Sequence, residues 1–251
     1  ETAARVLVYR LPNLFGKWCR PNYNSVTATF CHNIAHGQPI TINNPLTELT
    51  LAYIDDVVAE FIRALRGMPD MREDGFCHIG TTYTVTLGQL AGLIKSFCDC
   101  RTSRTVPDTS DEFTAKLYAT YLSYLPADGF SYPLELHSDA RGSFAEFLRT
   151  PERGQISVNV TRPGAVRGNH WHNTKNEKFL VISGSGVIRF RRVGDGEVFE
   201  YAVDGATPRV VEIPPGYTHS IVNTGDADLV TLIWASECFD PSKPDTFAEE
   251  V

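Results

Sequence analysis

Residues 170–177 read His-Trp-His-Asn-Thr-Lys-Asn-Glu, and residues 214–219 read Pro-Pro-Gly-Tyr-Thr-His. Two imidazoles at positions i and i+2 point to the same side of a β-strand. The polar bend after them lets the carboxylate that ends the first stretch fold back, and the second stretch supplies a third imidazole. Three neutral imidazoles and one carboxylate complete the coordination of a borderline transition metal. The predicted metal ligands are therefore His170, His172, Glu177 and His219.

The sequence on both sides of these stretches is rich in short β-like runs, from about Tyr132 to the end of the chain. Gly-rich bends separate the runs at residues 183–186, 194–196 and 224–226. The dipeptide Asp195-Gly196 favours a tight hairpin turn. Many short strands at this spacing indicate an all-β sandwich or a small barrel.

The first hundred residues alternate between strand-like and helix-like patterns, which is typical of an α/β unit. Buried strands are expected at residues 5–11 and 50–54. A helix is expected at residues 24–36, with Asn24 or Ser25 as its N-cap and Gly37 as its stop.

Two further helices are indicated by their caps: one begins at Asp55 and Asp56, and one follows the capping box of Thr86 and Gln89. A last helix is expected at about residues 108–125, before a proline that helps to end it. The domain junction is placed after this helix. The prediction is an α/β domain over residues 1–130 and an all-β domain over residues 131–251.

Composition and charge exclude several functional classes. The chain has 251 residues and a formal net charge of −7, so it lacks the basic surface expected of a nucleic-acid-binding protein. It has no long uncharged apolar stretch and no signal peptide, which argues against membrane insertion and export. The six cysteines form no CxxC pair, which favours reduced thiols in the cytoplasm. Because the chain starts at Glu1 rather than Met, within a strand-like pattern, we expect a fragment or a processed product.

The β-rich half resembles the cupin family. The first cupin motif is matched at every spacing, from Gly164 through the two histidines and the glutamate to Gly184. The second motif is matched at Pro214, Gly216, His219 and Asn223, but its leading glycine is absent. The resemblance implies a jelly-roll barrel that holds one metal. The alternative is a cupin that has lost its metal and keeps the histidines as a hydrogen-bonded lining.

Upstream segments resemble the branch of cupins that epimerises nucleotide sugars, at residues 139–144, 155–157 and 166–170. Arginines of that branch hold a nucleotide diphosphate, and guanidinium suits bidentate phosphate contacts. The resemblance implies that Arg141 and Arg167 bind phosphate and that Gln155 contacts substrate. The alternative for Arg141 is a surface residue paired with Asp139.

Two positions depart from the metal-free epimerases of this branch. His172 stands where they usually carry glutamine, and Phe239 falls near the position of their catalytic tyrosine. Because a phenyl ring has no proton to give, the His/Tyr acid–base pair is not transferred to this chain. A metal-assisted epimerisation fits these residues better. Alternatively, the metal organises the barrel while Lys175 or Tyr217 transfers the proton.

The α/β half resembles part of an extended short-chain dehydrogenase/reductase, at residues 10–18 and 51–57. The Gly-rich cofactor loop of that family is absent, and none of the ten tyrosines is followed by lysine at the fourth position. We therefore assign no cofactor-binding residue and expect weak NAD(P)H binding. The resemblance implies a UDP-sugar site at Asn13, Arg20, Asn22 and Asn24, although the asparagines also suit turns and caps.

A reductase fragment followed by this cupin resembles a family of bifunctional capsular polysaccharide enzymes. That resemblance implies epimerisation at C3 of a UDP-4-keto-6-deoxy-N-acetyl-hexosamine in the cupin. Reduction of C4 with NADPH, in the full-length enzyme, would then give UDP-N-acetyl-6-deoxy-talosamine. It also implies zinc in the cupin and a homodimer.

Two readings from other functional classes stay open. Three histidines and a glutamate also suit iron, so the cupin can be a dioxygenase. The cupin can also be a non-catalytic module that serves dimerisation or stability. Converging arginine and lysine side chains at the barrel mouth would favour a substrate site over such a module.

Overall fold

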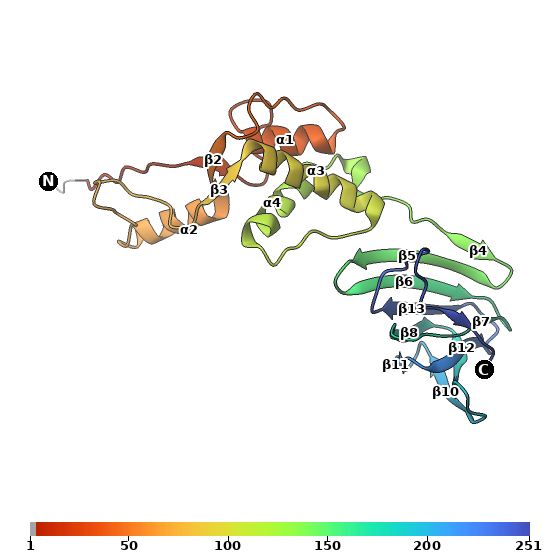
Figure 1. Ribbon diagram of the computed structural model, residues 1–251. Coiled ribbons are helices and arrows are strands. Elements are labelled where there is room, and N and C mark those ends of the chain that lie inside the picture. Colours follow the sequence, from red (N-terminus) through yellow and green to blue (C-terminus); the bar gives the residue numbers. More distant parts are fainter. Residues whose placement is uncertain (1–3) are drawn as a thin grey trace. The chain divides into compact units, whose positions relative to one another are not determined.

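The structure, a computed structural model, describes residues 4–251, so Glu1 lies outside the described residues. The chain divides into two compact units (Figure 1). The first consists of the residues up to Thr102 together with Pro107–Tyr132. The second consists of Ser103–Val106 together with Pro133–Val251.

The first unit is an α/β unit built on a three-stranded sheet of order β1-β2-β3. The β1 and β2 strands are parallel, and β2 and β3 are antiparallel. Its elements are β1 (Asn13–Phe15), α1 (Val26–Ala35), β2 (Glu48–Tyr53), α2 (Ile54–Leu65), β3 (Tyr83–Thr86), α3 (Leu87–Ser103), α4 (Glu112–Leu122) and the short 3₁₀ helix η1 (Ala127–Phe130). This alternation confirms the predicted fold class of the first half.

Local capping chemistry sets the helix ends. Ser25, rather than Asn24, is the N-cap of α1, where its side chain accepts a hydrogen bond from the backbone N–H of Ala28. Gly37 follows the helix with a φ of 64°, the left-handed conformation that glycine adopts without strain. Thr86 and Gln89 form the predicted capping box, because each side chain accepts from the other's backbone N–H. The helices then pack on a core that includes Phe15, Leu51, Leu90, Ile94, Phe97, Leu117 and Tyr121.

The strand predicted over residues 5–11 is wrong. Only Tyr9 makes a bridge in this stretch, to Cys77, and β1 begins later, at Asn13. Val6 and Val8 are 78% and 52% exposed. An apolar run becomes a buried strand only when neighbouring elements cover it, and among the described residues of this run only Tyr9 packs on a buried cluster and on the ring of Phe61.

Helix α2 carries an apolar row that also lies in solvent. Its members follow the i, i+3, i+4, i+7 spacing of one helix face, and each is at least 41% exposed: Val58, Phe61, Ile62 and Leu65. An apolar helix face of this kind normally contacts another element.

The second unit is all-β and consists of two packed sheets. One sheet has the order β10-β9-β12-β7-β14, and the other has the order β11-β8-β13-β6-β5-β4. The strands are β4 (His137–Asp139), β5 (Gly142–Thr150), β6 (Gly154–Thr161), β7 (Val166–Trp171), β8 (Glu177–Ser183), β9 (Ser185–Arg192), β10 (Val198–Asp204), β11 (Val210–Ile213), β12 (Tyr217–Asn223), β13 (Leu229–Ala235) and β14 (Phe247–Ala248). All strand pairs of this unit are antiparallel, which confirms the predicted cupin architecture.

Side chains from both sheets fill one end of this unit. The buried cluster includes Phe179, Val181, Ile188, Phe190, Ile213, Ile221 and Leu229. Residues 193–197 join β9 to β10, and the tight turn predicted at Asp195-Gly196 is wrong: the turn is centred on Val193 and Gly194, since the N–H of Asp195 donates to the carbonyl of Arg192 and Gly194 has a φ of 82°. The buried His219 adjoins this cluster, with its ring 5.9 Å from that of Phe179.

The sequence also led us to expect no membrane-spanning helix and reduced cysteines. No helix within residues 4–251 combines the length and the apolar character needed to cross a lipid bilayer. All six cysteines are free thiols in the described part of the chain.

Candidate metal centre

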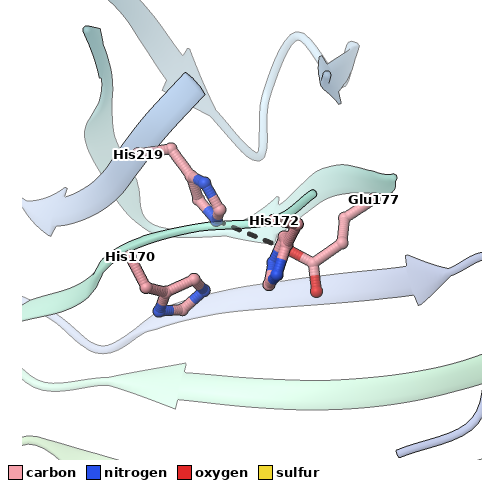
Figure 2. Close-up of side chains that lie close together, drawn as sticks. All are labelled: His170, His172, Glu177 and His219. Carbon is pink, nitrogen blue, oxygen red and sulfur yellow. Dashed lines mark ion pairs between the residues drawn. The ribbon is translucent and has the colours of Figure 1, made fainter. Parts of the chain in front are cut away.

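Three strands bring the four predicted ligands together. His170 lies on β7 and His172 follows the end of that strand, Glu177 is the first residue of β8, and His219 on β12 lies directly opposite His170. One ligand atom from each residue lies within 4.8 Å of the others. Figure 2 shows the four side chains turned toward a common point.

The surroundings favour metal-binding protonation states for two of these groups, His170 and Glu177. His172, Glu177 and His219 are buried. Burial, reinforced by the neighbouring imidazoles, lowers the pKa of His170 to about 4, so its ring is neutral near pH 7. Burial alone raises the pKa of Glu177, but the facing imidazoles of His172 and His219 outweigh it, and the pKa lies well below its usual range. The site therefore presents a carboxylate beside a neutral imidazole.

Hydrogen bonds on the outer side of two rings determine which nitrogen faces inward. Nδ1 of His172 lies 2.5 Å from the main-chain oxygen of Asp245, and Nδ1 of His219 lies 3.4 Å from that of Tyr217. Because a carbonyl oxygen only accepts, the short contact of His172 places a proton on its Nδ1 and leaves its Nε2 to face the other ligands. The contact of His219 is longer, and its Nδ1 faces the carbonyl of Tyr217 in the same orientation.

Both Nε2 atoms are buried and have no hydrogen-bond partner among the described residues. Each lies 3.4 Å from Oε2 of Glu177, which is longer than a usual N–H···O bond. Donor atoms around a tetrahedral zinc with bonds of about 2.0–2.1 Å are roughly 3.4 Å apart. Two buried imidazole nitrogens and a carboxylate oxygen at this spacing form a donor set that suits a cation. The residues therefore fit a divalent metal.

A β-bulge in β7 changes the direction in which its side chains point. Gly168 and Asn169 have φ values of 92° and 58°, and the register between β7 and β12 shifts at this point. Side chains three residues apart point to opposite faces of a regular strand. The extra residue of the bulge brings the side chains of Arg167 and His170 to the same face, so that both line the same cavity.

His170, His172 and Glu177 border a cavity with two lobes inside the second unit, whereas His219 is fully buried and lines neither lobe. The inner lobe, about 180 Å³, is lined by polar groups that include Arg167, Ser157 and Asn159. The outer lobe, about 350 Å³, is lined by residues that include Lys175 and Phe239. His170, Glu177, Gln155, Phe144 and Ala235 border both lobes. The barrel thus carries an arginine and a lysine rather than an apolar plug.

The three predicted substrate residues of this unit differ in their surroundings. The side chain of Arg167 is only 16% exposed, and its buried Nε has no hydrogen-bond partner within the described chain. Arg141 is 55% exposed, and its guanidinium binds Asp139 through Nε and Nη2. Arg167 is therefore the better placed of the two arginines for a ligand in the cavity.

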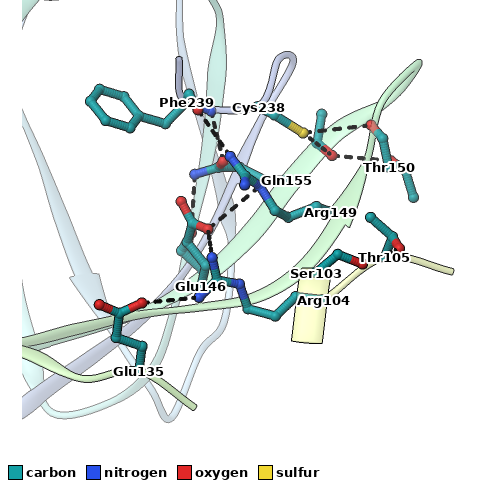
Figure 3. A network of polar contacts seen from close by, with 12 residues as sticks. Ser103, Arg104, Thr105, Glu135, Glu146, Arg149, Thr150, Gln155, Cys238 and Phe239 are labelled. Carbon is teal, nitrogen blue, oxygen red and sulfur yellow. Dashed lines mark hydrogen bonds and ion pairs between the residues drawn. The ribbon is translucent and has the colours of Figure 1, made fainter. Parts of the chain in front are cut away.

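Gln155 is held by the polar network that Figure 3 shows. Its Oε1 accepts a hydrogen bond from the backbone N–H of Phe239, and its Nε2 donates to Ser157.

Two arginines extend this network. The guanidinium of Arg149 donates to the carbonyl of Phe239 and lies 3.5 Å from the carboxylate of Glu146. Arg104 pairs with the same carboxylate at 3.0 Å. The network fixes the amide of Gln155 at the junction of the two lobes.

The two predicted proton-transfer residues lie in different places. Lys175 lines the outer lobe, where its Nζ is 3.1 Å from Oγ1 of Thr246. Tyr217 packs against the apolar cluster, with its ring 6.0 Å from that of Phe199. It is not among the residues that line the two lobes. Lys175 is the better placed of the two, and the role of each stays a prediction.

The four predicted sugar-nucleotide residues of the α/β unit lie on β1 and on the loop before α1. The Arg20 guanidinium stacks over the ring of Tyr23, and Asn22 binds Thr29 and Asn33 with a φ of 54°. Asn13 begins β1, and Asn24 precedes the N-cap. The cavity described in this unit lies elsewhere, next to Arg10 and His78, so a ligand role for these four residues stays a prediction.

Sequence reasoning missed two features of the centre. Ser157 and Asn159 follow Gln155 at alternate positions on β6, and this polar alternation inside a strand could have been noticed. Asp245 contacts the metal-binding segment from a position 73 residues beyond His172, and no motif marks it.

Known proteins resemble both units. Residues 137–247 match the family model of the polysaccharide biosynthesis C-terminal domain. The chain is 45% identical over 243 residues to a UDP-2-acetamido-2,6-beta-L-arabino-hexul-4-ose reductase of Pseudomonas aeruginosa, covering 97% of the chain and 65% of the reductase. The chain therefore spans slightly less than two thirds of that relative's length.

Solved structures extend the likeness to the whole fold. The capsular polysaccharide assembling protein CapF of Staphylococcus aureus is 55% identical, with a TM-score of 0.94 over 98% of this chain and 71% of CapF. A structure of CapF with the inhibitor 3-isopropenyl-tropolone gives a TM-score of 0.95 at the same identity, over 98% of this chain and 70% of that one.

Proposed function

This chain belongs to the CapF family, and from that premise we propose that its cupin unit epimerises C3 of a UDP-4-keto-6-deoxy-N-acetyl-hexosamine with the support of one bound zinc ion. The cavity in the cupin unit is the observation that most supports this proposal. Two imidazoles and the carboxylate of the ligand set border it, together with a largely buried arginine and a lysine, and the third imidazole lies within 4.8 Å of them. The printed name of the Pseudomonas relative, a reductase of a UDP-linked hexulose, supports the substrate class.

Epimerisation removes a proton from the carbon next to a ketone and returns one to the opposite face. The intermediate is an enolate, whose negative charge must be stabilised where it develops. His170, His172, Glu177 and His219 would hold a divalent metal, which would supply Lewis-acid stabilisation worth several kcal/mol where its coordination keeps a position open to the substrate oxygen. In this proposal Arg167 binds the diphosphate, Gln155 orients the sugar, and Lys175 at the outer lobe moves the proton.

The α/β unit would contribute the second step, reduction of C4 with NADPH, only within the longer enzyme. The sequence contains no Gly-rich cofactor loop, and it covers 65% of the reductase relative. The exposed apolar row on α2 supports this proposal, because a dinucleotide-binding part would provide the surface that the row needs. A homodimer is proposed on the family resemblance.

Proton exchange tests the epimerase directly. In heavy water, the zinc-loaded protein is expected to place deuterium at C3 of the UDP-4-keto sugar, because the proton returned to the enolate comes from solvent. Mass spectrometry and proton NMR of the recovered sugar nucleotide provide the measurement.

Two controls accompany the exchange experiment. Protein stripped with a chelator should exchange slowly, and metal analysis should find about one zinc ion per chain. Absence of deuterium at C3 with the zinc-loaded protein would refute the epimerase. Stoichiometric iron with consumption of oxygen would favour the dioxygenase reading instead.

Nucleotide binding provides an independent prediction. Arg167→Ala is expected to weaken UDP binding roughly 10- to 100-fold, since a hydrogen bond to a charged group contributes about 1.5–3 kcal/mol. Calorimetric titration with UDP measures the change. Arg167→Lys should recover only part of the affinity, because lysine keeps the charge but loses the planar fork.

Arg162→Ala is the matched control, since this neighbouring arginine is exposed and contacts the carbonyl of Ala140. Its UDP affinity should equal that of the wild type. An unchanged affinity in Arg167→Ala would remove this residue from the proposed phosphate site.

A further inference from the structure

The C-terminal segment 245–249, here called the C-terminal strap, runs along the metal-binding strand. Its strand β14 pairs with β7, so that Phe247 lies opposite Trp171 and Ala248 lies opposite His170. The rings of Phe247 and Trp171 stack with centroids 4.5 Å apart. The strap therefore forms the edge of the sheet that carries two of the four ligands.

Asp245 begins the strap and binds the turn that follows His172. Its carboxylate accepts hydrogen bonds from the backbone N–H groups of Asn173, Thr174 and Lys175 at 2.9, 2.7 and 2.8 Å. It also accepts from the hydroxyl of Thr174 at 3.1 Å. Burial raises the pKa of Asp245, but these donors outweigh that effect and hold the pKa well below its usual range. The side chain is therefore an anion bound by consecutive backbone donors.

The main-chain oxygen of the same residue accepts the Nδ1–H of His172. One residue thus contacts both a ligand and the turn that leads from that ligand to Glu177. At the other end of the strap, the N–H of Glu249 donates to the carbonyl of the bulged Asn169, and the carbonyl of Glu249 accepts from the hydroxyl of Thr218. Thr218 directly precedes His219.

We propose that Asp245 is a positioning residue for the metal centre, and that the C-terminal strap holds His172, the turn after it and Glu177 in their metal-binding arrangement. The inference rests on the proposed metal site. It goes beyond that site because it assigns a role to a segment that supplies no ligand. Partners that orient a metal-binding histidine typically change metal affinity 10- to 100-fold when they are removed.

If Asp245 had only a structural role, zinc would stabilise the variant and the wild type by the same amount. If Asp245 only joined the chain end to the barrel, its loss would lower the melting temperature of the metal-free and zinc-loaded proteins equally. If it positions the ligands, zinc would stabilise the variant less than it stabilises the wild type, since the gain depends on the dissociation constant. The zinc-induced increase in melting temperature therefore separates the two roles.

The experiment compares wild type, Asp245→Ala, Asp245→Asn and the control Asp240→Asn in the full chain. Asp240 lies on the same C-terminal tail, and its carboxylate also accepts from a backbone N–H and a hydroxyl, both of Ser242. Zinc affinity is measured by competition with a chromophoric chelator. Visible absorption of the Co²⁺-loaded proteins reports the coordination geometry, and thermal melts are recorded with and without zinc.

Asp245→Ala keeps the main-chain carbonyl that accepts from His172 but removes the acceptor of three backbone N–H groups in the turn, so it is expected to bind zinc roughly 10-fold more weakly, with an altered Co²⁺ spectrum. Asp245→Asn should show a smaller loss, because its amide keeps one acceptor oxygen, and Asp240→Asn should match the wild type. If Asp245→Ala does not fold, Asp245→Asn decides the question by the same measurements.

Wild-type zinc affinity and an unchanged Co²⁺ spectrum in the folded Asp245 variants would overturn the inference and leave the metal site intact. Equal melting losses with and without zinc would overturn it too. A wild-type protein that binds neither Zn²⁺ nor Co²⁺ would overturn the metal site and the inference together.

Discussion

His219→Ala is expected to lower deuterium exchange at C3 by about 10²- to 10³-fold and to leave the purified protein without stoichiometric zinc. His219 is fully buried, and its Nε2 faces the carboxylate of Glu177 with no other partner in the described chain. Loss of a metal that contributes several kcal/mol to enolate stabilisation reduces the rate by this amount. The loss of zinc affinity should exceed the 10- to 100-fold typical of residues that only orient a ligand.

Metal analysis and the heavy-water assay measure the two effects on the same preparation. His36→Ala is the control, because His36 is an exposed residue at the end of α1 in the other unit. It should keep both zinc and exchange. A zinc-free His219→Ala protein with wild-type exchange would show that the metal only organises the barrel. A His219→Ala protein that keeps stoichiometric zinc at wild-type affinity would contradict the assignment of this ligand.

Sequence spacing was sufficient to predict that the four side chains meet, because their positions depend on local geometry. Two histidines at i and i+2 share a face wherever a strand forms, and Glu177 starts the next strand after a short turn. His219 is remote in sequence, but the cupin motif that contains it specifies a strand beside the first one, and the structure pairs it with His170.

Other parts of the centre depend on contacts that no local pattern encodes. The bulge at Gly168 and Asn169 exists because β7 and β12 slip in register, and the sequence does not state which strands pair. Asp245 meets its donors only after the chain has completed the barrel. The strand expected at residues 5–11 failed for the same reason, since its pairing within the described chain is limited to a single bridge at Tyr9 and Val6 and Val8 stay exposed.

Gly168→Ala is expected to lower the unfolding free energy of the cupin unit by about 2–4 kcal/mol, a fall of roughly 10 °C in its melting temperature. Gly168 has a φ of 92°, where an L side chain is strained. A Cβ at this position would lie 2.7 Å from the carbonyl oxygen of His219 and 2.9 Å from the Cα of Ser220. Both are backbone atoms, so β7 and β12 would have to separate.

This separation would act on the metal centre as well as on stability, because the two strands carry His170 and His219 opposite each other. We therefore expect zinc affinity to fall with the melting temperature, as measured by chelator competition and thermal melts. Gly196→Ala is the matched control, since a Cβ there meets no atom within 4 Å and the residue has no positive φ. A Gly168→Ala protein that melts like the control and binds zinc like the wild type would show that the bulge tolerates a side chain. The bulge would then not explain why Arg167 and His170 line the same cavity.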